Sequence, residues 1–288
     1  MNDLIVYLNG EYLPIGEAKV SVLDRGFVFG DGVYEVIPVY QQQPFRLAQH
    51  LVRLQNSLDA VRINNPCTSQ QWEEILRRLI TQNGFDDQSI YLQVTRGVAK
   101  RDHFFPKDVQ PTVFVMTNPL PAVDRESALR GIAAITLDDI RWQYCNIKAI
   151  TLLPNVLLRQ QAADNGAYEA ILVRDGNVTE GAASNIFIVK NGTIKTPPKS
   201  PLLLPGITRD LVVELAQAHG IACQETPFSQ SELFNADEIW LTSSTREIFP
   251  VVTLNGNPVH SGKAGPLTTQ MYDIYQAYKT QLKQGKAL

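Results

Sequence analysis

Lys148 is the residue of this 288-residue chain whose surroundings best suit covalent chemistry. Residues 138–147 before it are mixed apolar and β-branched, which predicts a strand end. A helix is expected over 152–166, with Thr151 as its N-cap and Pro154 in its first turn. A lysine at such a junction can be partly desolvated, which lowers its pKa and makes its amine a better nucleophile. Taken alone, such a lysine is more commonly a solvated surface charge.

Glu180 is a second candidate, because small residues follow it in the segment 178–185. Small side chains leave room for a large, flat molecule to approach the backbone. A carboxylate that faces a pyridinium nitrogen would keep that nitrogen protonated, through an ion pair and a charge-assisted hydrogen bond. The simpler alternative is a solvated carboxylate between two strands.

Two further places in the chain offer groups that bind anions. Ile207 and Thr208 open a predicted helix, whose free N–H groups and threonine hydroxyl suit a phosphate. Ser243 and Ser244 offer hydroxyl and N–H groups at a second strand-to-helix corner. Arg53 would add a guanidinium group to such a site. Taken separately, each of these residues is more simply a helix cap or a surface residue.

Other common chemistries lack their sequence signatures. The chain has no Cys-x-x-Cys pair and no His-Glu-x-x-His motif, and its four histidines are scattered, so no metal site is expected. It has no Gly-x-Ser-x-Gly nucleophile elbow. The segment 256–264 is one residue too long for a P-loop and lacks the metal-binding hydroxyl. A net charge of −3 without a basic run argues against a nucleic-acid binder.

The composition is that of a globular protein without a membrane span. Hydrophobic residues make up 44% of the chain and charged residues 19%. No apolar run approaches the ~18 residues of a membrane span, and the N-terminus lacks the positive region of a signal peptide. Cys67, Cys145 and Cys223 are odd in number and widely spaced, which indicates reduced thiols and a cytoplasmic location.

Residues 1–120 are expected to form a smaller domain that carries Arg53. The elements predicted there are a hairpin over 4–15, tight turns at the three glycines of 24–36, a strand over 33–40, helices over 46–63 and 69–83, and strands over 90–95 and 112–117. A polar stripe on the first of these helices consists of Arg46, His50, Arg53 and Ser57. A solvated face is the simplest interpretation of that stripe.

Residues 121–131 contain proline and several charges and are expected to link this domain to a larger one over 132–288. The elements predicted after the linker are a strand over 132–137, the helix after Lys148, a β-meander with strands over 169–173, 177–180, 185–190 and 193–196, a helix over 206–219, a strand over 238–242 and a helix over 267–282. A proline-rich loop over 197–205 directly precedes the helix that Ile207 and Thr208 open.

Eight short motifs occur in a fixed order along the chain. They are Asp24-Arg25-Gly26, Phe29-Gly30-Asp31-Gly32-Val33-Tyr34-Glu35-Val36, His50-Leu51-Val52-Arg53-Leu54, Ile147-Lys148, Tyr168-Glu169-Ala170-Ile171-Leu172, Val178-Thr179-Glu180-Gly181, Ser184-Asn185-Ile186-Phe187 and Gly206-Ile207-Thr208-Arg209. In this order they resemble the fold-type IV pyridoxal-phosphate enzymes, which include D-amino-acid aminotransferases, branched-chain aminotransferases and aminodeoxychorismate lyases. The resemblance covers nearly the whole chain. It implies a two-domain α+β fold, with a smaller N-terminal α/β sandwich domain and a larger C-terminal domain built on a β-barrel-like sheet with flanking helices.

The resemblance also implies roles for single residues. Lys148 would hold pyridoxal 5'-phosphate as a Schiff base, and Glu180 would pair with the pyridine nitrogen of that cofactor. Leu204 would pack against the cofactor ring. The residues of the implied phosphate cup are Arg53, Ile207, Thr208, Ser243 and Ser244.

The loop after Thr95 is similar to the D-amino-acid aminotransferase pattern. In that pattern Arg101 and His103, together with Tyr34, would hold the α-carboxylate of the substrate, because an arginine fork matches a carboxylate. Loops of the neighbouring subunit supply part of this carboxylate site in the pattern, so the resemblance implies a homodimer. The implied reaction converts D-alanine and 2-oxoglutarate to pyruvate and D-glutamate. An exposed polar loop is the alternative for this segment.

The chain departs from the Bacillus-type D-enzymes at a few positions. Ala182 and Ala183 stand where those enzymes carry serines that help to anchor the cofactor, and Ala149 and Pro154 differ from their Ser and Gly. Other activities also stay open, namely a branched-chain L-aminotransferase, an (R)-amine transaminase, an aminodeoxychorismate lyase, and a phosphate-ligand binding module with a decayed site. The Arg101-x-His103 loop argues against the first two of these.

Overall fold

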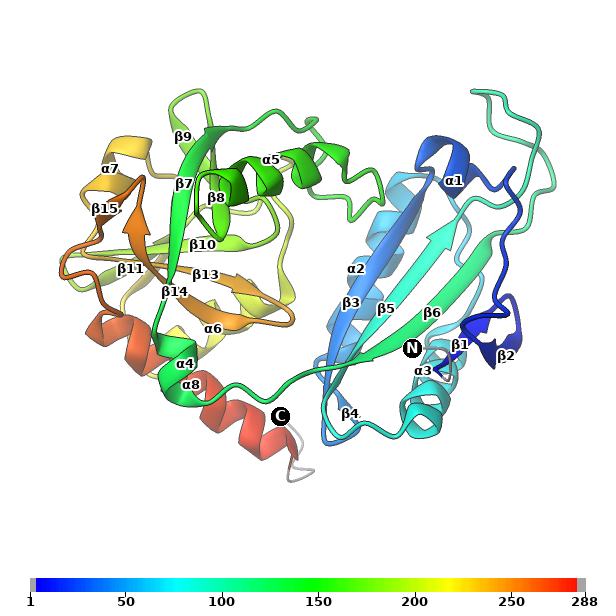
Figure 1. Cartoon of the computed structure of the whole chain (residues 1–288), viewed down its shortest axis with the longest axis horizontal. Helices are drawn as coiled ribbons and strands as arrows, with labels where there is room; N and C mark the ends of the chain where they lie inside the picture. The colour runs from blue at the N-terminus through cyan, green and yellow to red at the C-terminus, as the bar shows by residue number, and fades with distance from the viewer. Residues whose placement is uncertain (1–3, 284–288) are drawn as a thin grey trace. The chain divides into compact units, whose positions relative to one another are not determined.

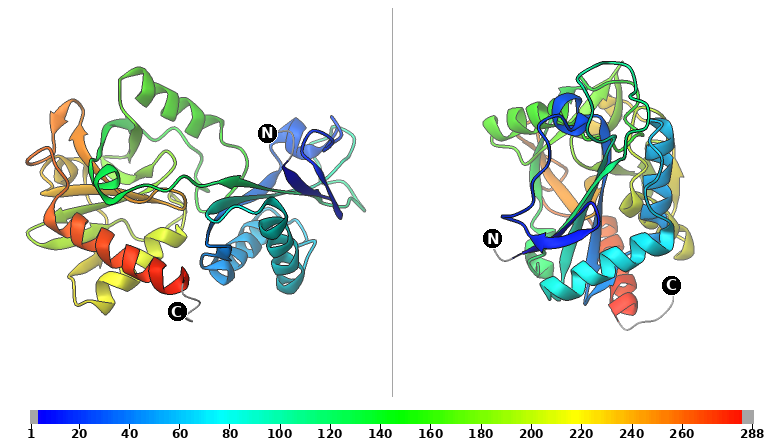
Figure 2. Two further views of the ribbon diagram at one scale, coloured as in Figure 1. Left: turned by 60° about the horizontal axis from the view of Figure 1, so that its bottom comes forward. Right: turned by 90° about the vertical axis from the view of Figure 1, so that its right-hand side faces the viewer.

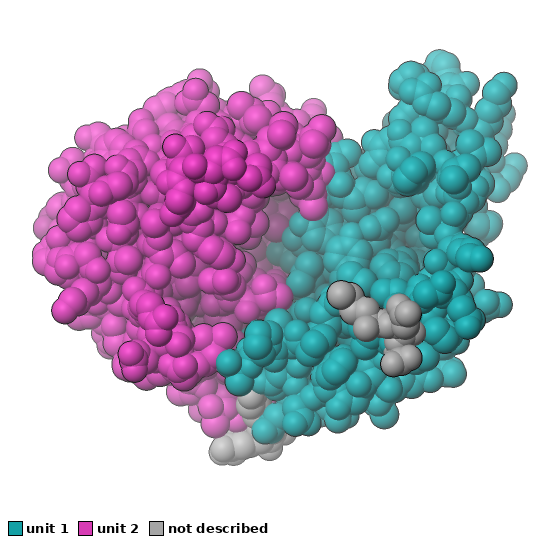
Figure 3. Space-filling view, viewed as in Figure 1, with its two compact units in different colours: residues 1–122, 147–151 teal, residues 123–146, 152–288 magenta. Residues whose placement is uncertain are grey.

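The computed structural model describes residues 4–283 and divides into two compact units (Figure 3). Unit 1 comprises Met1–Ala122 together with Ile147–Thr151, and unit 2 comprises Val123–Asn146 and Leu152–Leu288. The change of unit after Ala122 falls inside the segment expected as a linker, and 147–151 return to unit 1. Residues 1–3, which entered the expectation that a signal peptide is absent, and the predicted C-terminal domain end at 288 lie outside the described residues.

Unit 1 is a sheet covered on one face by two helices. Its strands are β1 (Ile5–Leu8), β2 (Glu11–Pro14), β3 (Gly32–Tyr40), β4 (Gln43–Pro44), β5 (Gln88–Thr95) and β6 (Thr112–Pro119). They form one six-stranded sheet in the order β2-β1-β6-β5-β3-β4, in which all neighbours are antiparallel. Helices α2 (Leu47–Ala60) and α3 (Ser69–Asn83) lie on the same face of it (Figures 1 and 2). The predicted hairpin, strands and helices of this region are confirmed.

The apolar sides of α2 and α3 pack onto the sheet in one buried cluster. Leu54 and Leu58 of α2 and Leu76 of α3 are fully buried in the same cluster as Ile37 and Leu92 of the sheet. Full burial of such a side chain stabilises the fold by roughly 1.5–3 kcal/mol. The leucine spacing of three and four residues therefore fixes which side of α2 faces β3.

A short helix, α1 (Arg25–Phe29), lies where only tight turns were expected. Asp24 caps it by accepting a hydrogen bond from the Gly26 N–H, and Gly30 ends it in the left-handed conformation with φ of 68°. A Cβ atom at Gly30 would lie 2.6 Å from Cγ2 of Thr151. The glycine is therefore both a helix C-cap and the point where 147–151 approach α1.

Unit 2 is built on a larger sheet. Its strands are β7 (Ile132–Asp138), β8 (Glu169–Arg174), β9 (Asn177–Gly181), β10 (Asn185–Lys190), β11 (Thr193–Thr196), β12 (Cys223–Glu225), β13 (Glu238–Ser243), β14 (Glu247–Leu254) and β15 (Asn257–Pro258). The nine-stranded sheet has the order β12-β11-β10-β13-β14-β7-β8-β9, with β15 paired to β14. Strand β9 contacts β10 without pairing with it, so the sheet curls towards a barrel.

The expected β-meander is wrong in its pairing. Strands β8 and β9 form one hairpin and β10 and β11 another, but β13, β14 and β7 lie between the two hairpins in the sheet. The reason is that β7 and β8 are parallel neighbours and need a crossover helix. That helix is α5 (Leu153–Asp164).

The helices of unit 2 are α4 (Arg125–Leu129), α5, α6 (Ile207–Ala218), α7 (Gln230–Phe234) and α8 (Pro266–Lys283). Helices α6 and α8 contact each other and both pack on β13, whereas α5 packs on β8 (Figure 1). The predicted helices after Lys148, after Gly206 and at the C-terminus are confirmed, while α4 lies within the expected linker. Within residues 4–283, no helix combines the length and the apolar character that crossing a bilayer requires.

Three local expectations around the candidate residues are wrong. Strand β7 ends at Asp138 and residues 139–146 are irregular, so Lys148 does not follow a strand directly. The N-cap of α5 is Leu152 and not Thr151, although Pro154 does lie in its first turn. Residues 244–246 form a turn that leads into β14, so Ser243 begins a β-hairpin and not a strand-to-helix corner.

Candidate active site

In unit 1, Arg53 is held by a buried glutamate. Its Nε lies 2.7 Å from Oε1 of Glu35 and its Nη2 lies 2.7 Å from Oε2. His50, one turn earlier on α2, places Nδ1 2.8 Å from the same Oε2. Burial would raise the pKa of Glu35, but Arg53 and His50 hold it well below its usual range. Since His50, Arg53 and Ser57 are buried, the interpretation of this stripe as a solvated face is wrong.

Lys148 joins this cluster through its backbone. Its N–H donates to Oγ of Ser57 at 3.2 Å, and its carbonyl accepts from the N–H of Tyr34 at 2.9 Å. The Lys148 ammonium lies 4.1 Å from the centre of the Tyr34 ring. Ala149 bridges to Val33, so the segment 147–151 extends the free side of β3. Three predicted site residues, Tyr34, Arg53 and Lys148, are thus organised around β3 and α2.

Arg101 and His103 lie in the exposed loop between β5 and β6. The Arg101 guanidinium carbon lies 5.1 Å from the centre of the Phe29 ring, and the His103 ring lies 5.5 Å from it. The structure therefore brings the two residues onto one aromatic side chain of α1. Tyr34 makes different contacts, with Lys148 and with the ring of Tyr91.

In unit 2, Glu180 is buried at the end of β9. It accepts hydrogen bonds from Nη1 of Arg141 at 2.5 Å, from Nδ2 of Asn185 at 3.0 Å and from the N–H of Leu204 at 3.1 Å. Burial nevertheless raises the pKa of Glu180 to about 7, with Arg141 opposing the rise. Because Glu180 is only 4% exposed, the alternative of a solvated carboxylate is wrong.

Arg141 does not offset the effect of burial on the pKa of Glu180, and it is shared with a second carboxylate. Its Nε and Nη2 both bond to the Asp139 carboxylate at 2.9 Å, which leaves only Nη1 for Glu180. Burial would raise the pKa of Asp139, but Arg141 and Arg174 lower it. Arg141 therefore faces two carboxylates, and the negative charge of Asp139 acts against the ionisation of Glu180. A protonated ring nitrogen would add a second cation beside Glu180, so this carboxylate fits pyridoxal phosphate.

The start of α6 is suited to a phosphate. No described side chain caps this helix, and Ile207 and Thr208 in its first turn are buried. A buried helix N-terminus without a cap has N–H groups that need an acceptor, and the helix dipole favours an anion. Asn185 packs so closely that a Cβ at Gly206 would lie 1.9 Å from its Oδ1, while its Nδ2 donates to the Leu204 carbonyl. Asn185 thus links the start of α6 to Leu204 and, through its bond to Glu180, to the buried carboxylate.

Ser243 and Ser244 occupy the hairpin that joins β13 and β14. Ser243 pairs with Glu247 across this hairpin, and its Oγ accepts from the N–H of Arg246 at 3.3 Å. Both serines are half-buried. Their assignment to the phosphate cup stays a prediction.

Sequence reasoning gave no role to Glu35, His50, Asp139, Arg141 or Asn185. The signal for the pair Asp139 and Arg141 was present as two opposite charges two residues apart near Lys148. Those charges lie in the irregular segment 139–146, so no periodicity marked them as buried. Glu35 and Asn185 stood inside recognised motifs without an assigned contact.

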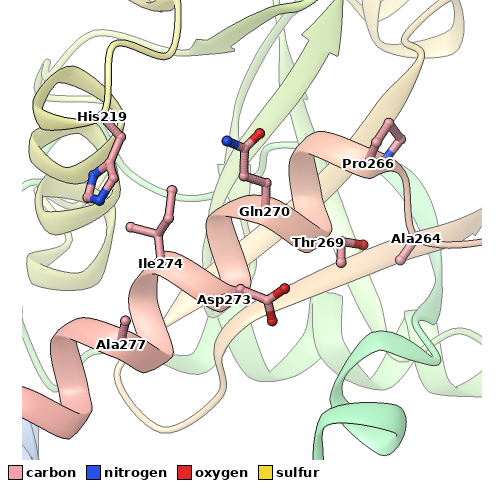
Figure 4. A pocket seen from close by; sticks show the side chains of 8 residues that line it. All are labelled: His219, Ala264, Pro266, Thr269, Gln270, Asp273, Ile274 and Ala277. Carbon is pink, nitrogen blue, oxygen red and sulfur yellow. The ribbon is translucent and has the colours of Figure 1, made fainter.

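A separate hollow of 620 Å³ lies on unit 2 where α8 passes the end of α6 (Figure 4). It contains none of the predicted site residues. The residues that line it are His219, Ala264, Pro266, Thr269, Gln270, Asp273, Ile274 and Ala277.

Comparison with known proteins identifies the family. The model of the amino-transferase class IV family matches residues 32–254. D-alanine aminotransferase of Bacillus licheniformis is 40% identical over 271 residues, which cover 94% of this chain and 95% of that protein. D-alanine aminotransferase of Staphylococcus aureus (strain COL) is 39% identical over 276 residues, which cover 95% of this chain and 97% of that protein. The chain belongs to the class IV aminotransferase family.

Solved structures agree with this assignment. The branched-chain amino acid aminotransferase of Escherichia coli superposes with a TM-score of 0.91 at 29% identity, covering 96% of this chain and 94% of that one. The branched-chain amino acid aminotransferase of T.th., solved with pyridoxamine 5'-phosphate, gives 0.91 at 28% identity, covering 98% and 95%. The two-domain α+β fold expected from the resemblance is confirmed.

Proposed function

We propose that this protein is a homodimeric, pyridoxal-phosphate-dependent transaminase that moves amino groups between D-amino acids and 2-oxo acids. The observation that carries the proposal is the buried Glu180, whose negative charge Arg141 offsets only in part because it also pairs with Asp139. The relatives named D-alanine aminotransferase support the choice of D-amino acids, and their match extends over nearly the whole chain.

The chain's own residues would divide the work as follows. Lys148 would bind the carbonyl carbon of the cofactor and, once released, move a proton between the substrate Cα and the cofactor C4′. When bound, pyridoxal phosphate supplies an electron sink for the negative charge that develops at Cα. Glu180 would hold the ring nitrogen protonated through a charge-assisted hydrogen bond. Arg53, Ile207, Thr208, Ser243 and Ser244 would bind the phosphate, and Leu204 would pack against the ring.

Arg101 and His103, with Tyr34, are the proposed binding residues for the substrate carboxylate. Arg101 makes no ion pair with any acidic residue between positions 4 and 283, so its fork is available for a carboxylate. Asp31 in the same unit bonds to both Arg25 and Arg96, which leaves a local excess of positive charge. A carboxylate held in this way orients the Cα–H bond for proton removal.

A homodimer is proposed because apolar side chains around the loop of Arg101 are exposed. Val22, Phe27 and Phe104 expose 71%, 74% and 83% of their surfaces. Their segments are adjacent, since the Ala99 N–H donates to the Leu23 carbonyl. A contiguous apolar surface is typical of a protein–protein contact. In a dimer, the loop of one subunit would contribute to the carboxylate site of the other.

The dimer is tested by sedimentation. The protein should sediment at twice the mass of one chain, and Phe104→Asp should shift it towards the monomer. Arg77→Gln, at an exposed position on α3, is the matched surface control and should leave the mass unchanged. A wild-type monomer at micromolar concentration would contradict the dimer. The cytoplasm is the proposed location, supported by three free cysteines, and fractionation of the source cells would test it.

The reaction is tested by a half-reaction in the absence of any oxo acid. The cofactor-loaded protein is mixed with D-alanine, L-leucine or (R)-1-phenylethylamine, and the absorbance of the cofactor is followed. D-alanine alone should convert the cofactor rapidly to its aminated form, because only this amine presents a carboxylate with D-configuration. Conversion by L-leucine or by the amine without a carboxylate would contradict the substrate assignment and leave the cofactor chemistry intact.

A branched-chain L-aminotransferase is the second candidate, favoured by the solved structures of that activity. Their identities of 28–29% are lower than the 40% of the D-alanine aminotransferase of Bacillus licheniformis. A lyase is distinguished by its product, because an aminodeoxychorismate lyase would release pyruvate from aminodeoxychorismate without an amino acceptor.

A further inference from the structure

The loop 97–111 is closed at its base by a tight backbone approach. Gly97 has φ of +101°, and a Cβ there would lie 1.9 Å from the carbonyl oxygen of Gln110. The Arg25 N–H donates to the Gly97 carbonyl at 2.9 Å, and Asp24 bridges to Val98. The two ends of the loop are therefore fixed against each other and against the start of α1 (Figure 1).

Arg25 also reaches the tip of this loop. Its Nη1 donates to the carbonyl of Asp102 at 2.6 Å, between Arg101 and His103 in the sequence. Its Nε bonds to Asp31 at 2.7 Å, which fixes the plane of the guanidinium. The residue is 4% exposed, so these bonds are shielded from water. A charged donor in such a place is worth more than a neutral surface hydrogen bond.

Phe29 holds the two side chains that flank Asp102. The guanidinium carbon of Arg25 lies 4.7 Å from the centre of the Phe29 ring, that of Arg101 lies 5.1 Å away, and the His103 ring lies 5.5 Å away. A cation within about 6 Å of an aromatic face is attracted by its quadrupole. Arg101 and His103 therefore contact the same ring, and that ring is itself in contact with Arg25.

We propose that Arg25 and Phe29 are positioning residues for substrate binding, which fix the loop 97–111 so that Arg101 and His103 meet a carboxylate as one preformed pair. Neither residue touches the substrate in this arrangement. Arg25 sets the backbone between the two side chains, and Phe29 sets their orientation. This inference rests on the proposed function, which assigns the substrate carboxylate to Arg101 and His103.

Preformation lowers the cost of binding, because side chains that are already ordered lose less entropy when the carboxylate arrives. Loss of the Arg25 or Phe29 contacts should therefore weaken the binding of every substrate that carries an α-carboxylate, whether amino acid or oxo acid. It should not slow the proton transfer at Cα once the substrate is bound. The expected signature is a rise in KM without a fall in kcat.

The test compares Phe29→Leu and Arg25→Lys with the wild-type holoenzyme. Lysine keeps the charge beside Asp31 but has no fork to reach the Asp102 carbonyl at the same time. We expect KM for D-alanine and for 2-oxoglutarate to rise together, about fivefold in Phe29→Leu and about tenfold or more in Arg25→Lys. The kcat values should stay within about twofold of the wild-type values, because Arg25 and Phe29 do not contact the reacting atoms.

Tyr12→Leu is the matched control. Tyr12 lies on β2 of the same unit and carries the guanidinium of Arg78 3.9 Å from its ring centre, so it makes the same kind of contact away from the loop. Its KM values should equal those of the wild type. An equal rise in KM in this control, or a fall in kcat with unchanged KM in Phe29→Leu, would overturn the proposal.

Hydrogen exchange supplies a readout that does not depend on activity. The amides of residues 97–105 should exchange several-fold faster in Phe29→Leu and Arg25→Lys than in the wild type, while the peptides of α3 should be unchanged. Faster exchange with unchanged KM values would overturn the positioning role. A wild-type protein that does not react with D-alanine would count against the proposed function. The exchange data would still show whether Arg25 and Phe29 order the loop 97–111.

Discussion

Glu35 in unit 1 and Glu180 in unit 2 are both buried glutamates bonded to arginine, yet their pKa values move in opposite directions. Burial favours the neutral form of each. For Glu35 this effect is outweighed and the pKa lies well below its usual range, whereas for Glu180 the pKa rises to about 7. The difference lies in how much positive charge faces each carboxylate.

Glu35 receives two nitrogens of Arg53 and one of His50. Glu180 receives one nitrogen of Arg141, whose Nε and Nη2 bond to Asp139, and its other donors, Asn185 and the Leu204 N–H, are neutral. The first carboxylate is therefore satisfied within the protein and has a structural role, which is to hold Arg53 in place. The second carries a charge that the protein only partly compensates, as expected of a group that meets a cationic ligand.

The largest effect is expected when the ion pair between Glu35 and Arg53 is broken. Glu35→Gln should lower the free energy of unfolding of the apoprotein by about 3–5 kcal/mol, because the buried Arg53 loses its carboxylate partner. Urea denaturation at pH 7 measures this change. Glu73→Gln, which removes the exposed partner of Arg77, should change stability by less than about 1 kcal/mol. Equal effects of the two substitutions would show that Glu35 is not the structural carboxylate.

Glu180→Gln should have the opposite profile. Steady-state transamination of D-alanine should fall by about 10²–10³-fold, because an amide cannot hold the ring nitrogen protonated. The apoprotein should be at least as stable as the wild type at pH 8, because the substitution removes a buried and partly compensated charge. Activity within tenfold of the wild type would remove Glu180 from the cofactor site.

These two glutamates also show what sequence can and cannot reveal. Periodicity predicted α2 and α6, because their apolar stripes are local patterns. The burial of His50 and Arg53 was not predictable from α2 alone, because it depends on Glu35, which lies on strand β3. In the same way, the sharing of Arg141 depends on Glu180, which lies 39 residues further along the chain.

Strand pairing was the other feature that could not be predicted from the sequence. The four strands of 169–196 were each predicted, but their neighbours in the sheet are β7 and β13, which the sequence does not place beside them. The irregular segment 139–146 has no repeating pattern, so its ion pairs became visible only in the structure. Motif order, in contrast, pointed to Lys148 and Glu180 because it does not depend on local periodicity.

A smaller effect is expected at the other end of the cofactor. If Glu180 binds the ring nitrogen, the start of α6 is left for the phosphate, and Thr208→Val should weaken pyridoxal-phosphate binding about fivefold through loss of one hydrogen bond. Fluorescence titration of the apoprotein measures this affinity. Thr193→Val on β11 is the control and should bind the cofactor as the wild type does. Unchanged affinity in Thr208→Val would exclude its hydroxyl from the phosphate cup.

The central claim is that the charge of Glu180 is only partly compensated until the cofactor binds, and the pH dependence of apoprotein stability tests it most directly. Between its ordinary pKa of 4.5 and about 7, the folded protein keeps a proton on Glu180 that the unfolded chain releases. Stability from this group therefore falls as pH rises through that window, by about 3 kcal/mol in total. Because Glu180→Gln has no carboxyl group at this position, its unfolding free energy should rise relative to that of the wild type by the same amount as the pH increases through this window.

Saturating pyridoxal phosphate should abolish the growth of that difference, because the ring nitrogen then compensates the charge. Parallel stability curves for wild type and Glu180→Gln from pH 4.5 to 8 would contradict the account.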